Sequence, residues 1–166
     1  WLRNEYNKSR TIDPNIQQEI GCLEMELVDP HVCCDLSIPL NCKILRSKKQ
    51  IPNTIEFYFR KGITSVGPID ITKKRFTMID YNRVPYAGNG RTTRNAVYAF
   101  LYDNYVYVIS KDPSMKIVKY INVRGLFEDP SKLGEFTDCS GKACWSPYTI
   151  YPLNQWMWAY IKPQIV

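Results

Sequence analysis

The spacing of apolar residues near the N-terminus predicts a helix over residues 12–28. Four aliphatic side chains recur there at spacings of 4, 3 and 4, and therefore share one helical face: Ile16, Ile20, Leu23 and Leu27. Asp13 is a favourable N-cap, and Pro14 then occupies the first helical position, where its missing N–H is harmless. Asp29-Pro30 ends the pattern.

The middle of the chain changes to strand-like patterns, in which apolar and polar side chains alternate. Three runs are candidate strands: residues 42–47, 54–60 and 75–80. The clearest signal is a hairpin, because residues 96–102 and 105–110 are two β-prone runs joined by Asp103-Asn104. Both turn residues tolerate the positive φ that a two-residue type I′ turn requires. Residues 117–124 supply a third strand, so we expect an antiparallel meander.

The remaining segments predict short helices after the strands. Residues 131–136 indicate a helical turn, and residues 153–162 carry an apolar stripe between Pro152 and Pro163. We therefore expect an α+β fold, an antiparallel β-meander with a barrel-like core, an N-terminal helix and a C-terminal helix. One compact domain then contains an N-terminal helical arm, a β-rich core, and a C-terminal loop and helix: residues 1–30, 31–125 and 126–166.

The charge balance bears on partners rather than on the fold. The 166 residues carry a net charge of +6, so nucleic acid or an acidic protein surface would both suit this chain. No apolar stretch reaches the roughly 18 residues that a membrane-spanning helix needs. The chain begins at Trp1 rather than Met, so we expect a short N-terminal piece to be missing, and a cleaved targeting segment stays open.

The residue types give little support to catalysis. His31 is the single histidine, and it lies in a loop with no second His or Glu beside it in sequence. Most acid–base, nucleophilic and metal-hydrolytic sites draw on histidine, so a surface or capping role is favoured for His31. The paired carboxylates are ordinary surface residues. We therefore expect a protein that is not an enzyme and that uses no cofactor.

The six cysteines allow three interpretations. They are Cys22, Cys33, Cys34, Cys42, Cys139 and Cys144. Reduced structural thiols are favoured, because the spacings match no standard zinc knuckle and the adjacent pair Cys33-Cys34 would be unusual in a disulfide framework. A zinc half-site at Cys139 and Cys144 is the first alternative, and a disulfide is the second.

The loop at residues 88–94 combines Gly-Asn-Gly with Arg91 and Arg94. A strand follows it instead of a helix, so it is not a phosphate-binding loop. It is either a surface turn or an exposed contact loop for nucleic acid or for a partner's carboxylates. A second basic cluster is Lys73, Lys74 and Arg75. Tyrosines of the hairpin could stack on bases, but packing within a sheet explains them as well.

The predicted final helix is rich in aromatic residues. Its large side chains lie on more than one side: Trp156, Met157, Trp158 and Tyr160. A helix that is apolar over most of its circumference must be buried somewhere. Its own sheet could cover it, or a subunit or partner interface could, since Trp and Tyr are enriched at interfaces. Phe127 belongs to the same candidate interface.

Four segments together carry a resemblance to a known family. They are residues 80–86 (DYNRVPY), the hairpin at 96–110, residues 120–130 (YINVRGLFEDP) and residues 151–153 (YPL). The set resembles the ring-forming neck or tail-adaptor structural proteins of crAss-like phages that infect Bacteroidales. The similarity covers most of the chain, from the predicted helix at Asp13 to the end.

The resemblance implies a virion protein repeated as a homo-oligomeric ring beneath the portal, on the path through which DNA passes. It also implies assembly in the reducing cytoplasm of the bacterial host, contacts with the portal and other neck or tail proteins, and no catalytic residue or membrane. The basic clusters could then contact genomic DNA non-specifically. The alternative, from the residues alone, is a small basic β-domain that binds nucleic acid.

Overall fold

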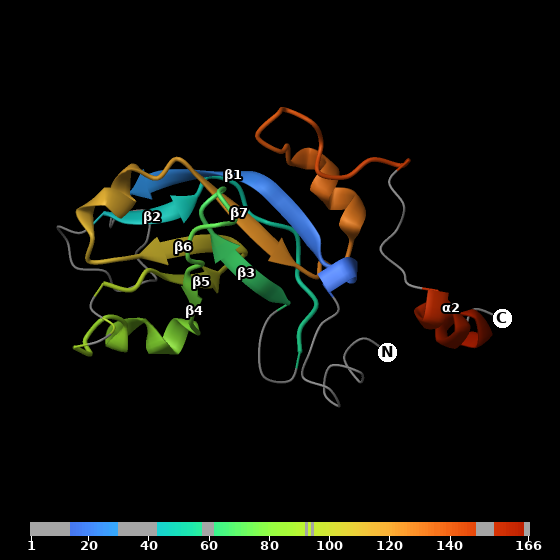
Figure 1. Cartoon of the computed structure of the whole chain (residues 1–166), viewed down its shortest axis with the longest axis horizontal. Coiled ribbons are helices and arrows are strands. Elements are labelled where there is room, and N and C mark those ends of the chain that lie inside the picture. Colours follow the sequence, from blue (N-terminus) through green and yellow to red (C-terminus); the bar gives the residue numbers. More distant parts are fainter. Residues whose placement is uncertain are drawn as a thin grey trace.

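Seven strands form one curved sheet in the computed structural model of the chain (Figure 1). The structure describes residues 14–29, 43–57, 62–91, 93, 95–148 and 155–164. The strands are β1 (Gln18–Val28), β2 (Ile44–Ser47), β3 (Ile63–Gly67), β4 (Thr77–Met78), β5 (Tyr98–Tyr102), β6 (Tyr105–Ile109) and β7 (Tyr120–Gly125). Their order across the sheet is β3-β7-β1-β2-β6-β5-β4. Every pairing is antiparallel except the parallel pairing of β4 with β5.

The sheet curls until its two edge strands, β3 and β4, approach each other. The amide of Phe76, just before β4, donates a hydrogen bond of 2.8 Å to the carbonyl of Val66 on β3. The result is a nearly closed barrel whose interior is filled by aliphatic side chains such as Ile20, Val66 and Val123, all of them fully buried. The α+β assignment is therefore wrong, because the described fold is mostly β with short helical turns.

The predicted N-terminal helix over residues 12–28 is wrong, while residues 1–13 of the predicted arm at 1–30 lie outside the described residues. Residues 18–28 form β1, preceded by a single 3-10 turn, η1 (Pro14–Ile16). Ile20 pairs with Val123 and Leu23 pairs with Ile121, so β1 carries one more residue than β7 between these pairs. This β-bulge keeps Ile20 and Leu23 on the inner face although they are three positions apart. A spacing of three is also the helical spacing, which explains the error.

The hairpin prediction is confirmed. β5 and β6 pair in register from Tyr98↔Ile109 to Tyr102↔Tyr105. Asp103 and Asn104 form the turn with φ of 47° and 57°, as a type I′ turn requires. The meander is wrong, because β7 pairs with β1 and β3 rather than with β6. A strand has two edges, and those of β6 are taken by β5 and β2.

The other predicted segments have mixed outcomes. The strands predicted at 42–47 and 75–80 contain β2 and the two-residue β4. In the run 54–60, Thr54 forms one isolated bridge to Phe127 and Phe57 is buried; residues 58–60 lie outside the described residues. The predicted turn at 131–136 is the 3-10 turn η6 (Pro130–Glu135), and the predicted final helix contains α2 (Gln155–Ile161), followed by the 3-10 turn η7 (Lys162–Gln164).

Two smaller clusters extend the barrel core. One joins Ile16, Phe57, Leu126 and Met157, and it connects α2 to the end of the barrel at which β1 begins (Figure 1). The other lies on the outer face of the sheet: Val28, Ile44, Phe100 and Tyr107. The 3-10 turn η4 (Tyr81–Tyr86) supplies Tyr81 and Val84 to this outer cluster. Both faces of this part of the sheet are therefore covered. Among the described helices, none has the length and apolar character needed to cross a membrane.

Candidate interaction surfaces

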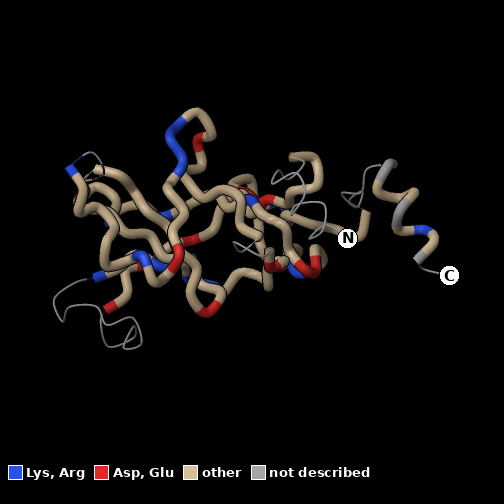
Figure 2. The backbone as a smooth tube through the Cα atoms, turned by 90° about the horizontal axis from the view of Figure 1, so that it is seen from below, with Lys and Arg blue, Asp and Glu red and all other residues tan. Residues whose placement is uncertain are grey.

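The basic cluster Lys73, Lys74 and Arg75 divides into two parts. Lys73 and Lys74 are exposed on the β3–β4 loop, where Asp70 binds the main chain and hydroxyl of Thr72. The Arg75 guanidinium instead donates to the Pro68 carbonyl at 2.8 Å and to Asn122 Oδ1 at 3.1 Å. Arg75 therefore anchors the loop, and the two lysines remain available for contacts. Elsewhere, basic and acidic residues are interspersed over the molecule (Figure 2).

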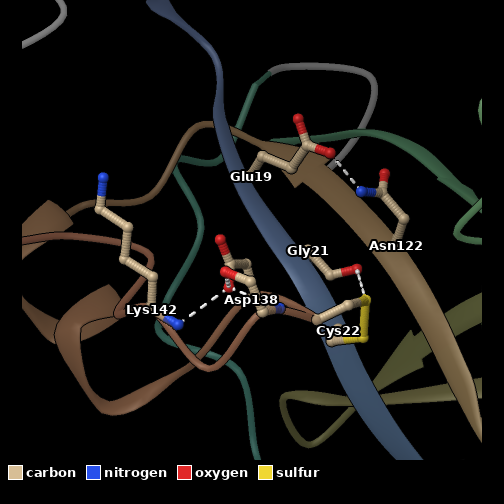
Figure 3. The surroundings of a disulfide bond; sticks show 8 residues. Glu19, Gly21, Cys22, Asn122, Asp138 and Lys142 are labelled. Carbon is tan, nitrogen blue, oxygen red and sulfur yellow. Dashed lines mark hydrogen bonds between the residues drawn. A yellow bond between two sulfur atoms is a disulfide. The ribbon is translucent and has the colours of Figure 1, made fainter.

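The partner of Arg75 belongs to a polar network on the outer face of β1 and β7. Asn122, nearly fully buried, donates its side-chain amide to Glu19. The second oxygen of Glu19 accepts a hydrogen bond from Arg124 Nε at 2.9 Å. Figure 3 shows the Glu19 carboxylate reaching across to Asn122 from the neighbouring strand. No sequence pattern predicts this network, because its members come from three separate segments.

The glycine-rich loop after η4 is built as a surface turn. Gly88 has φ of +73°, in the region that favours glycine, and its carbonyl accepts a hydrogen bond of 2.9 Å from Lys111 Nζ. The side-chain amide of Asn89 donates to the Pro85 carbonyl at 3.0 Å. Arg91 is exposed on this loop, while Arg94 lies outside the described residues. Arg91 thus remains a candidate contact residue.

The aromatic residues of the hairpin are packed rather than presented to solvent. Phe100 and Tyr107 stack with ring centroids 5.1 Å apart, and both are buried. Tyr81 of η4 lies against Phe100 and Tyr102, with ring centroids 6.1 and 4.9 Å away. The Arg46 guanidinium lies 4.4 Å from the ring of Tyr105. These contacts occupy the ring faces on which nucleotide bases would have to stack.

Some residues of the predicted aromatic interface are buried in the interior, and another is exposed. Met157 and Phe127 are 1% and 2% exposed, so both belong to the interior. Trp158, on the same helix as Met157, is 50% exposed. The side chains of Trp156 and Tyr160 lie outside the described part of the chain. Trp158 is therefore the described member of this set that presents an apolar surface.

Two of the cysteines form a disulfide, so their interpretation as reduced thiols is wrong. Cys22, at the bulge of β1, is bonded to Cys139 in the loop after η6, 117 positions away (Figure 3). Cys144 is a free, half-buried thiol, and burial raises its pKa. Within the described residues no group of three or more His, Cys, Asp and Glu could hold a metal ion. His31, Cys33, Cys34 and Cys42 lie outside those residues.

Comparison with known proteins identifies the family of this chain. A family model for phage tail ring protein 2 matches residues 1–166. The chain belongs to this family of crAss-like phage proteins. It is similar to Ring protein 2 of Bacteroides phage crAss001, with 29% identity over 92 residues. That match covers 55% of this chain and 39% of the relative's own length.

Membership of the phage tail ring protein 2 family confirms the resemblance found in the sequence. The protein is a structural component of a phage tail ring, and such a component is part of the virion. Ring proteins of this kind are structural and are not typically enzymes.

Proposed function

We propose that this chain is repeated around the tail axis as a homo-oligomeric ring in the neck, between the portal and the tail. In this position the ring forms part of the path through which DNA leaves the capsid. The whole-chain match to the phage tail ring protein 2 family carries the proposal. A closed ring of more than two identical subunits uses heterologous contacts, in which two different patches of the same chain meet.

Trp158 is the described residue best suited to one of these patches. It is half exposed on α2, and the same helix is anchored through the buried Met157. An exposed tryptophan on an anchored helix loses little conformational freedom when a partner covers it, and tryptophan is enriched among interface residues that dominate affinity. In this proposal α2 packs against its own barrel through Met157 and against a partner through Trp158, the two kinds of burial that the sequence left open.

The proposal is tested by native mass measurement of the full chain, alone and mixed with the portal and the neighbouring tail proteins. We expect a ring of defined copy number in at least one of these mixtures. Trp158→Ala should weaken assembly at least tenfold, equivalent to about 1.4 kcal/mol or more. Gln155→Ala, an exposed polar position on the same helix, is the matched control and should assemble normally. A chain that stays monomeric in every mixture would refute the ring.

Contact with DNA is a secondary part of the proposal, supported by the net charge of +6 and the exposed lysines of the β3–β4 loop. We expect weak binding to duplex DNA without sequence preference and with a steep dependence on salt. Replacing Lys73 and Lys74 by Ala should reduce the slope of log affinity against log salt by about 2 if both contact phosphates. An unchanged slope would exclude these lysines from DNA contact, and Arg91→Ala then tests the second basic loop.

A further inference from the structure

The seam between β3 and β4 is closed at one end only. At the closed end, the Phe76 amide donates to the Val66 carbonyl at 2.8 Å. Next to this pair, a Cβ added to Gly67 would lie 3.2 Å from the Cα of Arg75, so the two backbones are in contact there. Both contacts fit one antiparallel register between the two segments. In that register Ser65 faces Thr77, and the next pair able to exchange main-chain hydrogen bonds is Thr64 and Met78.

A groove replaces this next pair. It has a volume of about 620 Å³, and both Thr64 and Met78 line it. Its apolar lining includes Ile63 from β3, Ile79 after β4 and Leu101 from β5. The ladder that begins at Val66 and Phe76 therefore opens into a groove between two strand edges. Exposed strand edges are the usual docking sites for an additional strand.

The backbone of Met78 faces this groove. The amides of Thr77 and Ile79 donate to the carbonyls of Val97 and Ala99 at 2.8 and 2.9 Å, so both point towards β5. Successive amides along a strand point in opposite directions, and the Met78 amide between them consequently points away from β5. It is directed towards β3, across the groove that Met78 lines.

We propose that an extended segment of a second copy of this chain docks in the groove as an added strand, pairing with the Met78 edge. This inference rests on the proposed ring, because it names one of the two patches that a heterologous contact requires. The groove is the acceptor, and the donor is a segment elsewhere on the neighbouring copy. Main-chain pairing supplies affinity, and the apolar lining residues contact alternate side chains of the added strand.

Charge favours another copy of this chain as the occupant. The rim carries two carboxylates, Asp80 and Asp103, against one guanidinium, that of Arg83. Arg83 Nε lies 4.0 Å from Asp80, and both side chains are largely exposed, so this ion pair is weak. The chain itself has a net charge of +6. A basic segment of a neighbouring copy therefore complements the acidic rim.

Amide hydrogen exchange of the full chain, as monomer and in the assembled ring, tests the inference at single residues. We expect exchange of the Met78 amide to slow about tenfold or more on assembly. The amides of Thr77 and Ile79 are internal controls, because they are already hydrogen-bonded within the chain. A ring in which the Met78 amide exchanges as in the monomer would overturn the groove and leave the proposed ring intact. Failure to form any ring would remove both proposals.

Two double variants with the same change in net charge test whether a basic segment occupies the groove. Asp80→Asn with Asp103→Asn neutralises the rim, and asparagine suits the positive φ at position 103. Glu128→Gln with Glu135→Gln neutralises two exposed carboxylates that do not line the groove. We expect the rim variant to assemble at least fivefold more weakly than the control variant at low salt, with the difference shrinking as salt rises. Equal assembly of the two variants would overturn the assignment of a basic segment as occupant.

Discussion

Glu19 and Arg124 lie directly opposite each other on β1 and β7, with Arg124 Nη2 2.8 Å from a carboxylate oxygen of Glu19. The same carboxylate binds Asn122, which in turn accepts a hydrogen bond from Arg75. Arg75 also holds the Pro68 carbonyl at the other end of its loop. This chain of contacts attaches the β3–β4 loop, with its two exposed lysines, to the outer face of the barrel.

The network predicts a clear effect of Asn122→Ala. Asn122 is 3% exposed, and its removal leaves polar groups of Glu19 and Arg75 without their partner. The free energy of unfolding should fall by about 1–3 kcal/mol, as measured by urea denaturation. Glu24→Gln, which weakens the exposed pair between Lys48 and Glu24, should change it by no more than about 0.5 kcal/mol. Equal effects of the two substitutions would contradict the structural role given to Asn122.

The disulfide between Cys22 and Cys139 predicts a large effect of reduction. It closes a loop of 117 positions, and a cross-link of that span stabilises a folded protein by about 2–5 kcal/mol, mainly by restricting the unfolded chain. The oxidised protein should have the highest free energy of unfolding. The reduced protein and the Cys22→Ala/Cys139→Ala variant should have lower values that are similar to each other. Peptide mapping without reductant should recover the linked pair, and its absence from oxidised protein would contradict the assignment.

The hairpin turn predicts that position 103 tolerates glycine but not valine. Asp103 has φ of 47°, a conformation that β-branched residues adopt at a cost of about 1–2 kcal/mol. Asp103→Val should therefore lower the midpoint of urea denaturation, whereas Asp103→Gly should leave the free energy of unfolding within about 0.5 kcal/mol. If valine and glycine were tolerated equally, the type I′ turn would be incorrect.

Acid should loosen the loop that carries Cys139. The pKa of Asp138 is lowered because its carboxylate accepts hydrogen bonds from the Ser140 hydroxyl and from the Lys142 and Ser140 amides. A lowered folded pKa means that the charged form stabilises the fold above the ordinary aspartate range, about 3.9, and that this contribution disappears as the pH falls through the folded pKa. An NMR titration of the Asp138 side chain should show this lowered pKa.

Ser140→Ala is the matched test of the cause. It removes the hydroxyl that makes the largest contribution, so the pKa of Asp138 should move back towards its usual value. An Asp138 pKa that is the same in the variant and in the parent protein would show that the Ser140 hydroxyl does not stabilise the carboxylate. The hydrogen bond of 2.9 Å from the Lys142 amide to the Asp138 carboxylate is retained in the variant and keeps the loop closed.

The outcome for α2 shows how a correct local prediction can leave function open. The helical stripe was visible in residues 153–162, but burial of Met157 depends on Ile16, Phe57 and Leu126, which come from three distant segments. Exposure of Trp158 follows from the same packing, because one face of the helix is committed to that cluster. No spacing rule within ten residues can decide which aromatic side chain will face a partner.

The sequence by itself determined the elements whose causes are local. The Asp103-Asn104 turn, the two hairpin strands and the final helix depend on turn chemistry and short-range periodicity, and the structure contains all three. It also determined the family, since resemblance is carried by the residues themselves. The bulge in β1 imitated a helical period, so its true conformation depended on pairing with β7, about 100 positions away. The disulfide, the Glu19–Asn122–Arg75 network and the open seam were decided by the tertiary structure alone, because each requires the barrel to bring distant segments within bonding distance.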